Sequence, residues 1–147
     1  MKLSNPSNVE INVELYYDLD RDEEYNHLVI RGKKRHHAFD KTASEGGPHT
    51  ITWTLTGNAA GGRFCALDDL DNPGFTWLIR KPTGRIFRDL RAEGKHRISI
   101  HNHHHDKHSE GMWHYQLFAK FGNKVFGVPL TFGCGHSSNP NPTIKNT

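Results

Sequence analysis

Histidines are concentrated in one short stretch of the chain. Six of the twelve histidines lie in HNHHHDKHSEGMWHY, which runs from His101 to Tyr115. Neutral imidazoles held close together bind zinc, copper or nickel. Residues i, i+2 and i+4 of an extended strand share one face, so His101, His103 and His105 could present three ligands. If the chain folds back as a hairpin, His114 could approach them, and one hypothesis is a metal site made of these four histidines.

Two other interpretations of the histidine stretch stay open. The sequence has neither the HExxH pattern nor the paired cysteines of well-defined zinc sites, and it lacks a blue-copper ligand set. The histidines could therefore decorate the polar end of a hairpin whose turn is DKHSEG, Asp106 to Gly111. Clustered imidazoles also become charged together as the pH falls, which would give a pH-dependent surface. From the sequence alone, we favour a solvated hairpin end on which the histidines have no specific metal-binding role.

Other motifs point away from common catalytic and binding sites. Asp18, Asp20 and Asp22 are spaced like the start of a calcium-binding loop. Glu23 then stands where such a loop needs glycine, and Val29 where it needs a bidentate glutamate. The chain has no GxSxG motif, and its glycines match neither GxGxxG nor a Walker loop. We therefore expect neither a calcium loop nor a conventional hydrolase triad.

The composition indicates one small domain over residues 1–147. Hydrophobic residues make up 34% of the chain, and eight Phe, four Tyr and three Trp can fill a core. The net charge of +3 is mild, and we expect the basic run Arg31 to His37 to be a solvated loop rather than a nucleic-acid site.

The chain has no apolar leader and no apolar run of about 20 residues, so we expect a cytoplasmic location and no membrane span. Cys65 and Cys134 are expected as free thiols, with one disulfide as the alternative.

Alternating hydrophobic residues predict β-strands along most of the chain. The period of two occurs in NVEINVELYYD, HTITWTLTG, GFTWLIRK, HRISIHN and MWHYQLFAKF. Shorter candidates are HLVIRG, RFCAL, RIFRDL and KVFGVPL. Eight or nine short strands separated by turn residues predict an all-β fold, and we expect an antiparallel β-sandwich with Ig-like architecture rather than a barrel. Residues 131–147, rich in Gly, Ser, Asn and Pro, are expected to form a tail as a loop or edge segment.

Two segments in the last third of the chain, GMWHYQLFAKFGNKVF and NPTIKNT, form a recognisable pattern. In these segments the chain resembles the DP-EP family of small bacterial proteins, and the earlier ITWTL and FTWLI are compatible with it. The shared pattern is a tyrosine-centred strand, a short glycine turn, another strand, and then Asp-Pro, a β-branched residue and asparagine near the C-terminus. The resemblance implies a β-sandwich. It also implies self-cleavage at the Asp-Pro bond and a covalent link between a lysine and that aspartate.

This chain departs from the family at the reacting position, where Asn141 precedes Pro142. An asparagine cannot act as the same carboxylic acid. Its amide nitrogen could instead attack its own carbonyl and cleave the bond through a succinimide, because Pro142 has no N–H for ordinary deamidation. A neutral lysine could also attack the carboxamide, expel ammonia and leave an isopeptide bond, with Lys120 and Lys124 as candidates by region. The simpler interpretation is an unreactive, proline-stiffened tail with Ile144 against an edge strand.

The leading functional hypothesis from sequence is a non-enzymatic structural or interaction module. We expect it to form a homo-oligomer or to bind a protein partner through strand edges or faces, without an organic cofactor. Tyr16 and Phe118, on the outward faces of their strands, would suit such a surface. Self-processing at Asn141 and binding of zinc, copper or nickel by the histidine cluster are the alternatives.

Overall fold

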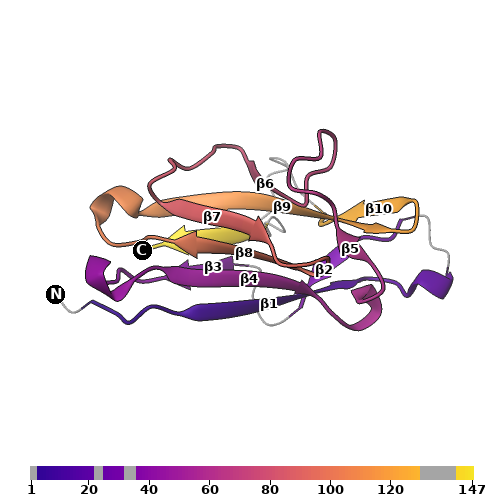
Figure 1. Cartoon of the computed structure of the whole chain (residues 1–147), viewed down its shortest axis with the longest axis horizontal. Helices are drawn as coiled ribbons and strands as arrows, with labels where there is room; N and C mark the ends of the chain where they lie inside the picture. The colour runs from indigo at the N-terminus through magenta and orange to yellow at the C-terminus, as the bar shows by residue number, and fades with distance from the viewer. Residues whose placement is uncertain (1–2, 22–24, 32–35, 130–141) are drawn as a thin grey trace, which may run out of the picture.

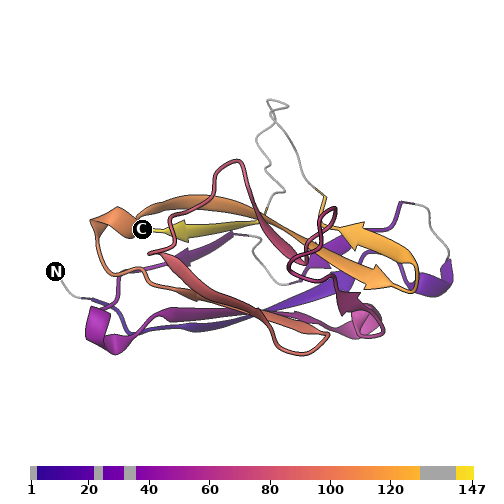
Figure 2. The ribbon, with the colours of Figure 1, turned by 45° about the horizontal axis from the view of Figure 1, so that its top comes forward.

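Two β-sheets pack against each other in the computed structural model, which describes residues 3–21, 25–31, 36–129 and 142–147 (Figures 1 and 2). The predicted all-β sandwich is confirmed. The strands are β1 (Asn8–Leu15), β2 (Leu28–Ile30), β3 (His36–Phe39), β4 (His49–Leu55), β5 (Arg63–Phe64), β6 (Phe75–Leu78), β7 (Phe87–Ala92), β8 (Arg97–Asn102), β9 (Gly111–Phe121), β10 (Lys124–Gly127) and β11 (Thr143–Asn146). The 3-10 helices are η1 (Leu19–Arg21), η2 (Ser44–Gly46), η3 (Gly57–Ala59) and η4 (Lys107–Ser109).

The first sheet holds the beginning of the histidine stretch. Its strand order is β2-β1-β4-β8-β7. β1 and β4 are parallel, whereas the other neighbouring strands are antiparallel. His101 on β8 lies opposite Thr50 of β4 on one side and opposite Arg88 of β7 on the other. His101 is therefore held inside the sheet, with a paired strand on each side.

The second sheet is organised around the long strand β9. The strand order is β10-β9-β11-β3, and β5 and β6 also pair with β9. β11 is antiparallel to β9 and parallel to β3. β6 places Trp77 opposite Tyr115, and β5 places Arg63 opposite Lys120. Strands that are distant in sequence thus meet at β9.

The core lies between the sheets and follows the predicted alternation. Most side chains expected to face inward are buried, including Val13, Ile51, Trp53, Tyr115 and Leu117. Ile79, expected on the inward face of GFTWLIRK, is instead 76% exposed, because β6 ends at Leu78 and Ile79 has a left-handed φ of 68°. Bulky aromatic rings contribute much of the apolar area that a sandwich of this size removes from water. Trp53, Phe75 and Tyr115 form one aromatic group, with the centroids of neighbouring rings 5.1–5.3 Å apart. The core therefore joins β4 of the first sheet to β6 and β9 of the second.

Two details of the predicted strands differ from the structure. The described residues form eleven strands rather than eight or nine, and two of the pairings are parallel. The sequence did not predict β3 and β11, which pair with each other. Each has only four residues, too few for alternation to be distinguished from a loop. The described residues contain no helix with the length and apolar character needed to cross a bilayer.

The C-terminal segment was expected to be a loop or an edge strand, and for its last residues this was wrong. β11 lies between β9 and β3, and Ile144 is fully buried. Its backbone pairs on both sides, which outweighs the weak strand signal of a sequence rich in polar residues. Residues 131–141 of the expected tail lie outside the described part of the chain.

Candidate metal centre

The histidine stretch connects the two sheets and does not form a hairpin within one of them. The chain leaves β8 in the first sheet, passes through η4 and enters β9 in the second. Asp106 caps η4 by accepting a hydrogen bond from the His108 N–H, and Ser109 completes a capping box. His114, on β9, consequently lies in the other sheet from His101, and the predicted approach across a hairpin is wrong.

The other three predicted ligands do share a face. His101, His103 and His105 are half-buried, whereas His104 between them is fully buried. The ring centroids of His101 and His103 are 6.3 Å apart, and those of His103 and His105 are 5.7 Å apart. The extended backbone predicted for this segment therefore places the three alternate side chains in a row.

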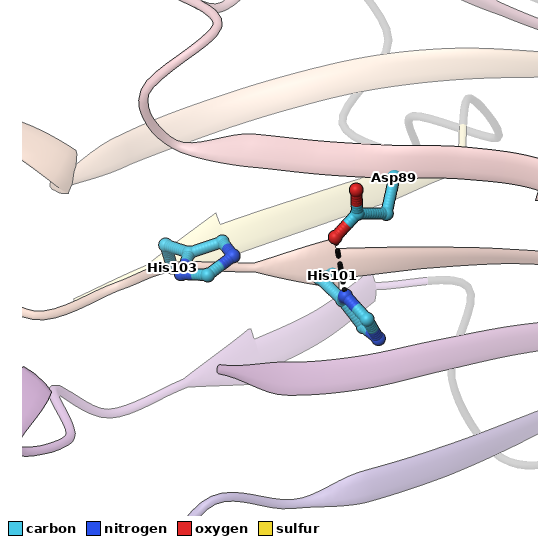
Figure 3. Close-up of side chains that lie close together, drawn as sticks. All are labelled: Asp89, His101 and His103. Atoms are coloured by element: carbon cyan, nitrogen blue, oxygen red, sulfur yellow. Dashed lines mark hydrogen bonds and ion pairs between the residues drawn. The ribbon is translucent and has the colours of Figure 1, made fainter. Parts of the chain in front are cut away.

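A carboxylate that the sequence analysis missed completes the cluster. The register of β7 against β8 shifts between Arg88 and Arg91, and Asp89 within this irregularity has a left-handed φ of 61°. Bulges redirect side chains and often lie beside functional sites. Here the Asp89 Oδ2 lies 2.9 Å from the His101 Nδ1 (Figure 3). One ligand atom from each of Asp89, His101 and His103 lies within 4.8 Å of the others.

The electrostatics of the cluster suit a cation. The hydrogen bond from His101 is the main cause that lowers the pKa of Asp89, so this carboxyl is an anion at neutral pH. Burial, followed by the nearby Arg88 charge, lowers the pKa of His103 and keeps its ring neutral. Only a neutral imidazole can donate a lone pair to a metal. The charges of Arg88, which acts on His103, and of Arg91, which acts on Asp89, oppose a bound cation.

The Nε2 atom of His103 is a buried polar atom that lacks a hydrogen-bond partner among the described residues. Buried polar atoms are nearly always paired, so such an atom calls for an explanation. Tetrahedral zinc has bonds of about 2.0–2.2 Å to nitrogen and oxygen, which places neighbouring ligand atoms about 3.4 Å apart. The three ligand atoms, which lie within 4.8 Å of one another, would have to move closer together to hold an ion, and Asp89 is exposed.

His105 lies next to this cluster without belonging to it. Its Nδ1 is within hydrogen-bond distance of the Thr42 carbonyl oxygen and hydroxyl, at 2.9 and 3.0 Å. On the opposite sheet, burial is the main cause that lowers the pKa of His114, followed by the charges of His36 and Arg80. Of the four predicted ligands, the structure thus brings together His101 and His103 and adds Asp89.

The residues predicted for self-processing are not brought into one described site. Asn141 lies outside the described residues, as does Cys134. Lys120 is half-buried on β9, opposite Arg63 and Val125, and Lys124 is exposed at the start of β10. Self-processing at Asn141 stays a prediction. Cys65 is a free, half-buried thiol whose pKa is raised, mainly by burial.

No family model, curated protein or solved structure matches the chain.

Proposed function

We propose that the protein binds one divalent transition-metal ion through Asp89, His101 and His103. The observation that carries this proposal is the convergence of three ligand atoms, from two paired segments, to within 4.8 Å of one another. A set of two imidazoles and one carboxylate suits zinc, copper and nickel, and copper is expected to bind most tightly. Such a set fills three positions of a tetrahedral site, which leaves a fourth for water or another ligand.

Isothermal titration calorimetry of the metal-free chain with zinc, copper and nickel salts tests this proposal. We expect one tight site per chain, and we expect His101→Gln or His103→Gln to weaken it by at least about tenfold. His114→Gln is the matched control, because it removes an imidazole from the other sheet. Several weak sites, or an equal effect of His114→Gln, would mean adventitious binding by surface histidines.

A second candidate function is the self-associating interaction module expected from sequence. It is favoured by the 56% exposure of Tyr16, an aromatic ring that a monomer leaves largely in water. Phe118 contributes less, because it is half-buried beside Gly127. Sedimentation velocity over a wide concentration range tests the idea, and Tyr16→Ser should weaken any dimer. The Ig-like architecture and the likeness to the DP-EP family also stay proposals.

A further inference from the structure

A basic pocket lies near the start of β8, whereas the candidate metal centre lies at its other end. The pocket has a volume of about 460 Å³. Three segments form it: the loop entering β5, the turn between β7 and β8, and the end of β9 with the turn that follows. Its lining residues are Gly61, Gly62, Arg63, Lys95, His96, Lys120 and Gly122. Figure 1 shows β5 and β10 together at this end of the molecule.

The charge of the lining is of one sign. Arg63, Lys95 and Lys120 are cations, His96 contributes an imidazole, and none of the described residues in the lining carries a carboxylate. Among the described residues, none of these four side chains forms an ion pair, although several other basic residues do. The carboxylate of Asp69 acts on Cys65, as do the charges of Lys120 and Arg63. The described lining therefore carries three positive charges, none of them neutralised in an ion pair.

Two of these cations face each other across paired strands. Arg63 of β5 lies opposite Lys120 of β9 in the antiparallel register. Like charges in this arrangement destabilise a sheet, and the half-burial of Lys120 limits its access to screening water. A fold that tolerates such a pair gains stability when an anion lies between the two charges. This arrangement distinguishes the pocket from a patch of scattered surface lysines.

The backbone holds the three segments close together. The Phe64 N–H donates a hydrogen bond of 2.9 Å to the Lys95 carbonyl oxygen, which fixes the β7–β8 turn against β5. A Cβ atom at Gly62 would lie 2.3 Å from the Phe121 ring, so only glycine permits this approach of the loop to β9. The cationic side chains thus project from a frame that is already assembled, which reduces the entropy lost when a ligand binds.

We propose that this pocket binds the phosphate group of a small phosphorylated molecule. Arg63 can donate two parallel hydrogen bonds to phosphate oxygens, and Lys95 and Lys120 supply point charges. The volume falls within the usual range for small-ligand pockets and exceeds the needs of phosphate alone. None of the described lining residues is a Phe, Tyr or Trp on which a base could stack, so the fit is to a phosphate monoester of a polar molecule such as a sugar.

Calorimetric titration of the full chain with inorganic phosphate and with pyrophosphate at low ionic strength tests this inference. We expect one saturable site for pyrophosphate, and we expect Lys95→Gln or Lys120→Gln to weaken it about tenfold. Lys95 is exposed on a turn, so its replacement should leave the fold intact. In nuclear magnetic resonance spectra, the amide signals of residues 61–63, 95–96 and 120–122 should shift together during the titration.

Lys81→Gln is the matched control, because it removes one positive charge from an exposed position outside the pocket. We expect its pyrophosphate affinity to stay within about twofold of that of the unchanged chain. The inference is overturned if no saturable binding occurs at millimolar pyrophosphate. It is equally overturned if Lys81→Gln weakens binding as much as Lys120→Gln, because binding would then follow net charge alone.

Discussion

The indole N–H of Trp53 donates a hydrogen bond of 3.0 Å to the hydroxyl of Tyr115, and both side chains are fully buried. Trp53 lies on β4 in the first sheet and Tyr115 on β9 in the second. This bond therefore links the two layers through the core. It also gives the polar group of each of these large residues a hydrogen-bond partner in an apolar interior.

Tyr115→Phe should lower the free energy of unfolding by about 1–3 kcal/mol, because the Trp53 N–H loses its acceptor while the ring volume is kept. Urea denaturation followed by tryptophan fluorescence measures the change. Tyr16→Phe is the matched control at an exposed position, where we expect a change within about 0.5 kcal/mol. Equal effects of the two substitutions would contradict a special role for the buried hydroxyl.

Asn102 and Asn146 form a second link between the sheets. Each side-chain amide donates to the other, at 2.8 and 3.1 Å, and Asn146 also donates to the Ser109 carbonyl oxygen. We expect Asn102→Ala and Asn146→Ala each to cost about 1–3 kcal/mol of unfolding free energy. The double variant should cost less than the sum, with a coupling of about 0.5–3 kcal/mol. Strict additivity in urea denaturation would show that the pair does not act as a unit.

The protein should become less stable as the pH falls below neutrality. His49 is buried, and burial is the main cause that lowers its pKa, although the carbonyl and charge of Asp40 oppose this. Its Nδ1 accepts from the Ser7 N–H at 2.9 Å, so protonation there would remove a hydrogen bond. His104, fully buried, likewise has a pKa lowered mainly by burial. The native state therefore holds both rings neutral.

The direction of this pH dependence follows from the linkage between proton binding and folding. An unfolded histidine has a pKa of about 6.5, so the unfolded chain binds protons more readily than the native chain as the pH drops through this value. Urea denaturation between pH 7.5 and 5 should show a falling free energy of unfolding. His49→Gln should make this slope shallower, because it removes one of the two buried rings whose pKa is lowered. A flat profile for the unchanged chain would refute the expectation.

Asp89→Asn separates metal binding from folding. Asparagine tolerates the left-handed backbone of this position and keeps the shape of the side chain, but it removes the negative charge. We expect metal affinity to fall about tenfold, while the urea midpoint of the metal-free chain stays close to that of the unchanged chain, because Asp89 is exposed. Calorimetric titration and urea denaturation measure the two quantities. A large loss of stability without loss of metal affinity would assign Asp89 a structural role instead.

The alternation of hydrophobic residues was enough to predict the sandwich and the shared face of His101, His103 and His105, because both depend on a period of two. It could not predict Asp89 as a neighbour of His101. That contact needs the register of β7 against β8 and a local irregularity, and RIFRDL carries no short-range signal for either. His114 was misplaced for a related reason. Whether a turn stays within a sheet or crosses to another depends on packing across the whole core.

The position of β11 has a consequence for how the protein is made. β3 and β9 both leave the ribosome before Thr143 to Asn146, yet in the native sheet β11 lies between them. Until it emerges, each of the two strands has an open edge that can pair with other chains. Domains generally fold as units during synthesis, and here the unit stays incomplete over that interval. The second sheet of the nascent chain is therefore exposed to edge pairing until β11 joins β9 to β3.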